Sequence, residues 1–347
     1  MTRFGVLSAR AFVACAIVTA LAGVSSRQPR PTAIAPGTRV LMDAHNAYPY
    51  SGRFTDRIDR ALGTGVPVAI EQDLVWRPGE GGRPGRSIVS HGAPFDDQEP
   101  SLRESFFERI RPLIERALRE DDRRAWPLVI LNLDLKSNEP EQLRALWTLL
   151  GEYEGWLTTA ERTADDSQPA PLDVKPVLVL TGSSEAQAAA FSDAVPAGAR
   201  LRLFGAILLR PPAGPDANRA AAERQFWEAL PTMPLPRATN YRRWWNAPWS
   251  VVEAGGQRKA GEWTQADDTR LRTLVQHAHD AGLWIRLWTL NGHAEGEEKT
   301  SGWSAGYNFG SLAAARERWR AAIAARADFV ATDQYEAFAE VLSAGVR

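Results

Sequence analysis

Two histidines stand at positions that suit acid–base chemistry. His45 ends the short β-rich run Thr38–His45, and His91 follows a glycine-rich loop. A neutral imidazole accepts a proton near pH 7 and an imidazolium donates one, so two such groups can serve both halves of a displacement reaction. His277 and His279 lie in a helical pattern and are expected to be structural or at the surface.

Three carboxylates and a lysine are predicted to share the inner face of two neighbouring strands. Successive side chains of a strand alternate between its faces, so Glu71 and Asp73 lie on one face of their run. The same alternation turns Asp134 and Lys136 inward, while the leucines between and before them turn outward. Charged side chains therefore converge near the carboxyl ends of two strands.

An excess of negative charge in that pocket favours a bound cation. Three acids face a single lysine, and a divalent ion neutralises such a surplus. Hard oxygen ligands without a nearby cysteine favour Mg²⁺ or Ca²⁺ over zinc. The alternative is a buried structural network of Glu71, Asp134 and Lys136, although desolvation makes buried ion pairs a weak source of stability.

Short β-rich runs alternate with helical patterns along the whole chain, which is typical of a parallel sheet with crossover helices. The predicted strands are Thr38–His45, Val66–Trp76, Leu128–Lys136, Lys175–Thr181, Leu201–Leu209, a weak sixth near Ala247–Val252, Leu283–Leu290 and Asp328–Thr332. The predicted helices are Ser101–Arg119, Pro140–Leu150, Ser184–Asp193, Asn218–Leu230, Gln265–Ala281 and Ser311–Ala325. Eight strands with helices between them predict a (β/α)8 TIM barrel, although a doubly wound open sheet would show similar alternation.

The segments Gly155–Pro176, Pro231–Gly261 and Asn291–Gly310 are predicted to be long loops because of their Pro, Gly and polar content. None of them marks a domain boundary, so residues 38–347 are expected to form one domain. The loop Arg77–Arg86 is predicted to be either a mobile lid or a disordered connection.

Tryptophans and two arginines are candidates for the rim of the barrel. Arg242 and Arg243 are candidate substrate contacts, with a surface role equally open. The aromatic rings could stack on a headgroup or touch a lipid surface, or they could simply pack the long loops. The tryptophans concerned are Trp244, Trp245, Trp249, Trp263, Trp288 and Trp303.

The first 26 residues have the pattern of a secretory signal peptide. Two arginines precede the apolar run Ala11–Val24, and Ala20-Leu21-Ala22 offers a cleavage site near Ala22. An uncleaved anchor is the alternative, but this run is shorter than the ~20 residues that a spanning helix needs. Residues 27–37 are expected to be a flexible leader, and the mature protein is expected to be secreted or periplasmic.

Charge and cysteine content exclude some classes. The formal net charge is -1 with acids and bases mixed along the chain, which argues against nucleic-acid binding by bulk electrostatics. The single cysteine, Cys15, lies inside the predicted signal peptide. A disulfide, a thiol nucleophile and a zinc–thiolate site are therefore not expected in the mature protein.

Taken in order, these polar residues resemble the phospholipase C-like phosphodiesterase superfamily, which includes glycerophosphodiester phosphodiesterases and phosphoinositide-specific phospholipases C. The resemblance spans residues 43–333, and each motif alone is of low specificity. The motifs are His45-Asn46, Glu71-x-Asp73, His91, Asp134-x-Lys136, Trp288-Thr289-Leu290-Asn291 and Thr332-Asp333.

This resemblance implies a TIM barrel that hydrolyses phosphodiesters or phospholipid headgroups with a divalent cation. It implies metal ligation by Glu71, Asp73 and Asp134 and acid–base catalysis by His45 and His91. It also implies that Lys136 lies beside the phosphate and that Trp288 lines the pocket.

Departures from the family pattern bear on the substrate. Asn46-Ala47 replaces the Arg-Gly usual in glycerophosphodiesterases and looks more like the eukaryotic-type phospholipases C, in which that asparagine helps to hold calcium. Asp134 stands where a glutamate is more usual, and Gly92 stands where glycerophosphodiesterases have an aspartate.

Two rival functions stay open at this point. A catalytically inactive barrel could bind a phosphorylated lipid or a glycan without turning it over. A barrel glycoside hydrolase could use a carboxylate pair and tryptophan-lined subsites, but that function does not explain the two histidines and the lysine.

Overall fold

The computed structural model describes Met1 and residues 34–345, apart from residues 50–51, 66, 96, 124–125, 212–218, 295 and 298–304. Apart from Met1, the predicted signal peptide lies outside these residues, as do residues 27–33 of the predicted leader. The strands are β1 Leu41–Ala44, β2 Val68–Arg77, β3 Arg86–Val89, β4 Val129–Leu135, β5 Thr159–Glu161, β6 Leu172–Asp173, β7 Val177–Thr181, β8 Arg200–Leu201, β9 Phe204–Ala206, β10 Arg242–Pro248, β11 Trp284–Trp288 and β12 Phe329–Thr332. The α-helices are α1 Arg57–Gly63, α2 Glu108–Glu120, α3 Pro140–Glu152, α4 Glu185–Ala188, α5 Arg219–Ala229, α6 Gln265–Asp280, α8 Leu312–Ala324 and α9 Tyr335–Gly345.

Short helical segments of other types complete the described elements. Two are π-helical, η1 Arg103–Phe107 before α2 and η3 Ala189–Asp193 after α4. The 3₁₀ segments are η2 Glu154–Trp156, η5 Leu230–Thr232, η6 Trp249–Val251, η7 Gln257–Lys259 and η8 Ala305–Tyr307.

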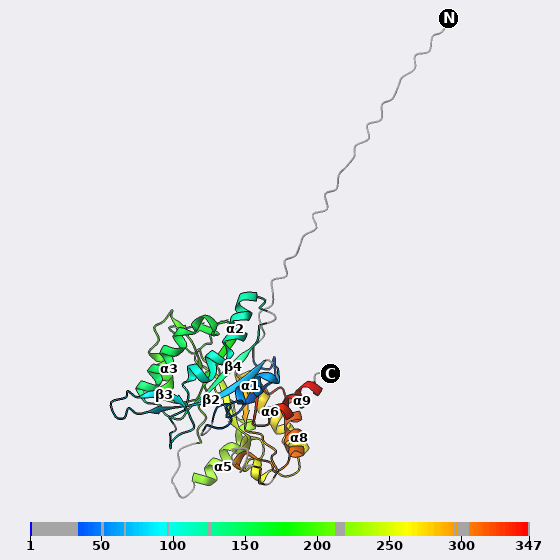
Figure 1. Cartoon of the computed structure of the whole chain (residues 1–347). Helices are drawn as coiled ribbons and strands as arrows, with labels where there is room; N and C mark the ends of the chain where they lie inside the picture. Colours follow the sequence, from blue (N-terminus) through cyan, green and yellow to red (C-terminus); the bar gives the residue numbers. More distant parts are fainter. Residues whose placement is uncertain are drawn as a thin grey trace.

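Eight parallel strands of the described chain close into a barrel. Their order is β1-β2-β4-β7-β9-β10-β11-β12, and β12 returns to pair with β1. Helices lie between successive strands and cover the outside of the barrel (Figure 1). This arrangement is a (β/α)8 TIM barrel, and it excludes the open sheet because both edges are paired.

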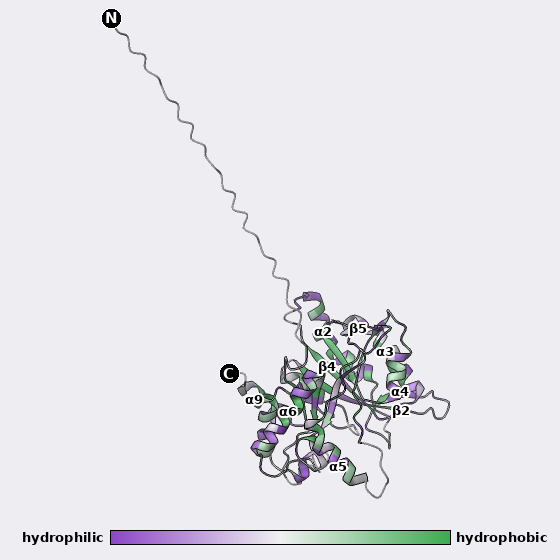
Figure 2. Ribbon diagram, turned by 180° about the vertical axis from the view of Figure 1, so that it is seen from behind, coloured by the Kyte–Doolittle hydropathy of each residue, from purple (hydrophilic) through white to green (hydrophobic). Residues whose placement is uncertain are grey.

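The hydrophobic core forms where the apolar outer faces of the strands pack against the surrounding helices. Val129, Leu131 and Leu133 of β4 are buried, as are Ile70 and Leu74 of β2. Figure 2 shows the hydrophobic strands inside and hydrophilic positions on the helices that surround them. Burial of this apolar surface is the main favourable term in folding, and it fixes the register that turns the polar residues of the same strands inward.

Local signals explain individual boundaries. Helix α6 begins at a capping box, in which the Thr264 hydroxyl accepts the Asp267 N–H and the Asp267 carboxylate accepts the Thr264 N–H. Helix α8 begins after Ser311, whose hydroxyl accepts the Ala314 N–H. The predicted helices match the observed ones to within a few residues, whereas α1 and α9 were not predicted.

Two predictions, one of a strand and one of a loop, were wrong. The sixth barrel strand, β10, spans Arg242–Pro248 and begins upstream of the predicted Ala247–Val252, whose second half forms η6. The strand was obscured because Arg-Arg-Trp-Trp-Asn shows no clean apolar alternation. The predicted loop Gly155–Pro176 contains β5 and β6, which pair with β8 in a small antiparallel sheet.

Most of the tryptophans assigned to the rim belong to the core. Trp244, Trp245 and Trp249 are buried, and Trp263 stacks on Trp249 with ring centroids 5.9 Å apart. Trp303 lies outside the described residues. Among the described residues, no helix combines the length and apolar character that crossing a bilayer requires.

Candidate active site

Parallel pairing of β1 with β12 places His45 beside Asp333. Ala44 is the register partner of Thr332, so the residues that follow both strands emerge side by side. The His45 Nδ1 atom lies 2.6 Å from an Asp333 carboxylate oxygen. The side chain of Asn291 donates to the other Asp333 oxygen and accepts the Asp333 backbone N–H. Asp333 is therefore fixed in orientation, and it in turn orients the imidazole.

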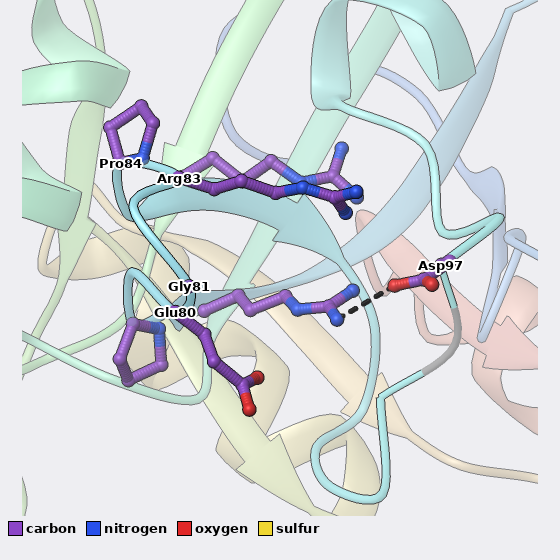
Figure 3. Close-up of a pocket in the computed structure, with 8 residues that line it drawn as sticks. Glu80, Gly81, Arg83, Pro84 and Asp97 are labelled. Carbon is purple, nitrogen blue, oxygen red and sulfur yellow. Dashed lines mark hydrogen bonds and ion pairs between the residues drawn. The ribbon is translucent and has the colours of Figure 1, made fainter.

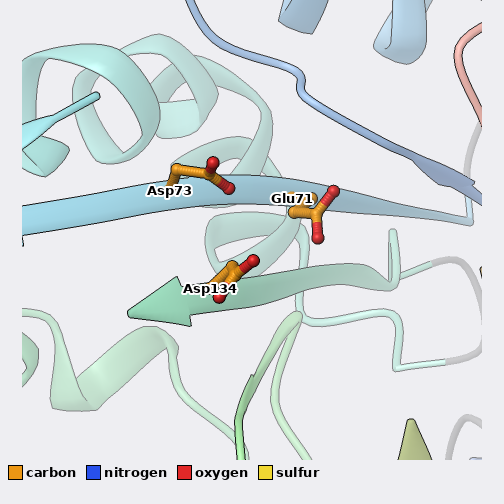
Figure 4. A group of neighbouring side chains, drawn as sticks. All are labelled: Glu71, Asp73 and Asp134. Atoms are coloured by element: carbon orange, nitrogen blue, oxygen red, sulfur yellow. The ribbon is translucent and has the colours of Figure 1, made fainter. Parts of the chain in front are cut away.

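Parallel pairing of β2 with β4 brings the three predicted carboxylates together. Asp73 is the register partner of Asp134, and one oxygen of each of Glu71, Asp73 and Asp134 lies within 4.8 Å of the others (Figure 4). The Lys136 ammonium contacts Asp134 at 2.6 Å and Asp73 at 3.0 Å. The predicted inward alternation is confirmed by these contacts.

Each carboxylate of this cluster has a different environment. Glu71 and Asp73 are buried, whereas the Asp134 side chain is 47 % exposed. The Asn46 backbone N–H donates to Glu71 at 3.1 Å, and the Tyr48 hydroxyl donates to Asp73 at 2.8 Å. The cluster is thus open to solvent on the Asp134 side and closed beneath.

Electrostatics show that the cluster carries more negative charge than its cations balance. Burial and the charges of Glu71 and Asp134 raise the pKa of Asp73 to about 7, despite the nearby Lys136. Burial opposes ionisation of Glu71, but the positive charges of Arg286 and His45 lower its pKa. One oxygen of Asp73, Oδ1, is buried and has no hydrogen-bond partner among the described residues. A divalent cation ligated by these oxygens fits both observations.

The two histidines differ in environment. Burial opposes protonation of His45, but the carboxylates of Asp333 and Glu71 raise its pKa to about 9. His91 is exposed, and partial burial together with the Lys136 charge lowers its pKa. It follows β3, which pairs with β2 as an antiparallel hairpin, and the adjacent Ser90 N–H donates to the Asp73 carbonyl. The hairpin therefore returns His91 to the strand that carries two of the carboxylates.

A cavity of about 550 Å³ joins these groups. The predicted residues that line it are His45, Asn46, Glu71, Asp73, His91, Asp134, Lys136 and Trp288. In addition, it is lined by Tyr48, Arg57, Asn246, Arg286 and Tyr307. The Tyr307 ring meets the rings of His45 and Trp288 edge to face, at 5.9 and 5.5 Å between centroids, and forms an aromatic wall beside His45.

Asn46 helps to shape the site through its backbone conformation and its contact with Tyr48. Its backbone is left-handed, with φ of 50°, and its side-chain amide lies 2.9 Å from the Tyr48 hydroxyl, whose hydrogen is directed to Asp73. A direct contribution of this side chain to a bound cation stays a prediction.

The prediction that Arg242 and Arg243 contact substrate is not supported by their positions. Arg243 is buried and donates to the carbonyls of Asn240 and Ala170, so its charge stabilises a loop. Arg242 donates to the carbonyls of Ser183 and Ala206. Neither arginine lines the cavity, because strand β10 places both against backbone carbonyls that need donors.

Sequence reasoning missed Arg286, and it named Asp333 only as part of a motif, without a role. Arg286 is buried inside the barrel, where it pairs with Asp43 and contacts Glu71 at 3.1 Å. A charged residue in the middle of the apolar run Trp284–Trp288 was the available signal, because charged side chains are rarely buried unless paired.

No protein-family model and no curated protein matches the sequence. Among solved structures, two glycerophosphodiester phosphodiesterases from Parabacteroides distasonis are similar. One has 11 % identity and a TM-score of 0.40, with 88 % of this chain and 87 % of that chain covered. The other has 9 % identity and a TM-score of 0.45, with 89 % and 98 % covered.

A third similar structure is a triple mutant of HPPK-DHPS from Plasmodium falciparum. It has 7 % identity and a TM-score of 0.42, with 90 % of this chain and 48 % of that chain covered. Because identities and TM-scores are this low, the fold is assigned from the strand order and register of the chain itself.

Proposed function

We propose that this protein is a metal-dependent phosphodiester hydrolase that acts on glycerophosphodiesters or phospholipid headgroups. The observation that carries the proposal is the cavity in which three carboxylates, a lysine and two imidazoles meet. A metal centre beside an acid–base pair is a combination that phosphoryl displacement needs, because charge grows on phosphate oxygens while protons move at both ends.

Glu71, Asp73 and Asp134 are the proposed ligands, with Asn46 as a candidate fourth. When bound, Mg²⁺ or Ca²⁺ supplies Lewis-acid stabilisation of negative charge on the phosphate. Lys136 lies at the edge of the same cluster, where its ammonium can donate to a non-bridging phosphate oxygen. The Lys136 charge that Asp73 and Asp134 now balance would then also bind the phosphate.

His45 is the proposed base and His91 the proposed acid; the lowered pKa of His91 leaves a smaller fraction protonated near pH 7 but makes that protonated form the stronger acid. His45 takes the proton of the attacking hydroxyl, the hydroxyl oxygen forms its bond to phosphorus, and His91 protonates the departing alkoxide. A substrate with a hydroxyl next to the phosphoester would give a cyclic phosphate by intramolecular attack. The negative charge of Glu71 helps to raise the pKa of His45. A cation bound to Glu71 would offset that charge and lower the pKa of His45, which favours the unprotonated form that a base requires.

The test is hydrolysis of a panel of phosphodiesters by the purified protein with Mg²⁺, with Ca²⁺ or with EDTA, with products identified by phosphorus NMR. We expect turnover that EDTA abolishes, and a loss of about 10²–10⁴-fold in kcat for His45→Ala and for His91→Ala. His277→Ala is the matched control, because His277 lies on α6 and does not line the cavity.

Other outcomes would point to the rival functions. Binding of a phosphorylated lipid or glycan without turnover would indicate an inactive barrel. Glycoside hydrolysis that survives EDTA would indicate a carboxylate-pair mechanism instead.

We propose in addition that residues 1–26 direct export and are removed near Ala22. The support is the arginine-flanked apolar run with its small-residue cleavage site. Mass spectrometry of the protein recovered from the periplasm or medium tests this proposal, and recovery of the intact chain from the cytoplasm alone would contradict it.

A further inference from the structure

A second cavity lies outside the catalytic one, at the hairpin that connects β2 to β3. It has a volume of about 670 Å³ and is rich in arginine (Figure 3). Its lining, which we term the arginine pocket, consists of Arg77, Pro78, Glu80, Gly81, Arg83, Pro84, Arg86 and Asp97. None of these residues lines the catalytic cavity.

The hairpin holds the backbone of these arginines in a defined arrangement. Arg77 and Arg86 are register partners, so their side chains leave the same face of the ribbon. Closer to the tip, Glu80 and Arg83 form an antiparallel bridge. Gly81 and Gly82 between them have φ of 59° and 80°, the pattern of the type I′ turn that closes two-residue hairpins. The ring of Trp76 packs so closely on Gly85 that a side chain there would meet it at 2.7 Å.

The arginine pocket carries a surplus of positive charge. Three guanidinium groups face two carboxylates, and one of these, Asp97, pairs with Arg77 at 2.8 Å. In Figure 3 the Arg83 side chain extends across the pocket toward the side on which Asp97 lies. Within the described part of the chain, the guanidinium groups of Arg83 and Arg86 have no carboxylate partner within ion-pair distance. A guanidinium fork matches the geometry of phosphate and binds it in a bidentate manner.

The pocket is close to the mouth of the catalytic cavity. Arg77 follows Asp73 by four residues on the same extended strand, which corresponds to roughly 13 Å along the strand. Both residues lie toward the carboxyl end of β2, the face at which TIM barrels bind substrate. Figure 1 shows the hairpin projecting from the body of the molecule. A surface that presents a substrate to the cavity would therefore meet the hairpin as well.

We propose that the arginine pocket binds the phosphate group of an anionic phospholipid and so docks the mouth of the barrel on a lipid surface. The pocket is open and its surplus of positive charge is small, so we expect its affinity for an isolated phosphate ion in solution to be low. A lipid surface presents many phosphates at once, and each basic residue near it adds to binding. This inference deepens the proposed function, on which its purpose rests, but the binding itself requires no turnover.

The test is co-sedimentation of the protein in EDTA with vesicles of phosphatidylcholine alone or with added phosphatidylglycerol. The variant is Arg83→Ala/Arg86→Ala, which removes two side chains without ion-pair partners in the described chain. Its matched control is Arg116→Ala/Arg119→Ala, two exposed arginines on α2. We expect the partition coefficient on the anionic vesicles to fall by about 25-fold in the variant, roughly fivefold for each lost charge. The control should bind as the wild type does, and added salt should weaken binding by screening.

Three results would overturn the inference. One is wild-type binding that does not depend on phosphatidylglycerol, and another is an equal loss of binding in the control. The third is calorimetric binding of inorganic phosphate that Arg83→Ala/Arg86→Ala abolishes while vesicle binding persists, because the pocket would then take soluble phosphate. Hydrolysis of a soluble phosphodiester, measured on the same proteins, separates failure of this inference from failure of the proposed function.

Discussion

At the scale of single residues, the unusual feature is an imidazole held between two carboxylates. His45 contacts Asp333 at 2.6 Å and Glu71 at 3.5 Å, and its side chain is only 12 % exposed. Asp333 carries no ligand role in the proposed metal centre, and Asn291 and the backbone fix it in place. Asp333 is thus a positioning residue that sets both the direction and the proton affinity of His45.

Replacing Asp333 by asparagine keeps the shape of the side chain and removes its charge. In protein freed of divalent cations, the pKa of His45, about 9 in the wild type, is expected to fall by a unit or more in Asp333→Asn. The folded pKa exceeds the value of 6.5 for an unperturbed histidine. The stabilisation is therefore fully present below that value and is lost as the pH rises through about 9.

Urea denaturation in EDTA and an NMR titration of His45 measure these effects. The variant should lose about 1–3 kcal/mol of unfolding free energy near pH 6, and much less near pH 10. Equal losses at both pH values would show that Asp333 contributes by packing alone. Asp59→Asn serves as control, because Asp59 pairs with Arg109 at the exposed surface, where an ion pair contributes little.

At the scale of elements, strand register brings the site together, and this determines what the sequence could predict. The carboxylates of β2 and β4 were predictable, because two-residue alternation in strongly apolar runs fixes their face. The environment of Arg243 was not, because one of its two backbone partners is the carbonyl of Ala170, which lies in a loop distant in the chain. The role of Asp333 depends on the pairing of β1 with β12, which closes the barrel. These strands lie at opposite ends of the domain sequence, so no local sequence pattern shows that Asp333 contacts His45.

The loop after β11 shows how close packing of elements serves the site. Gly292 follows Asn291, the residue that holds Asp333, and the loop passes directly over the start of α8. A Cβ atom at position 292 would lie 2.3 Å from the Ser311 carbonyl oxygen and 2.7 Å from the Ala315 Cβ. Only glycine lets the loop approach α8 this closely.

Gly292→Ala is therefore expected to lower the unfolding free energy by about 1–3 kcal/mol, the range found for overpacking. Because the loop must shift, kcat on a phosphodiester should fall as well, through displacement of Asn291 from Asp333. Gly155→Ala is the matched control, since nothing lies within 4 Å of its added methyl group. Equal stability of the two variants in urea denaturation would refute the packing argument.

At the scale of the whole molecule, the barrel interior holds two layers of charged side chains, and the balance between acids and cations differs between them. Asp43 and Arg286 neutralise each other beneath the site, and Asn132 donates to Asp43 from β4. In the layer above, Lys136 contacts Asp73 and Asp134, and Arg286 contacts Glu71 as well as Asp43, so the carboxylates outnumber these two cations. The folded barrel is consequently destabilised by repulsion that a bound divalent cation would relieve.

Adding Mg²⁺ or Ca²⁺ should therefore stabilise the native state and not only support turnover. A ligand that binds the folded protein alone contributes about 2.7 kcal/mol at a concentration one hundred times its Kd. For a domain of this size that corresponds to a rise of several degrees in Tm, measured by calorimetry with the cation and with EDTA. Asp134→Asn should abolish most of the rise, because it removes a proposed ligand from a half-exposed position at little cost to the fold. Asp122→Asn, at an exposed position outside the site, should leave the rise unchanged. A rise of equal size in wild type and Asp134→Asn would place the cation elsewhere and would remove the metal centre from the proposed mechanism.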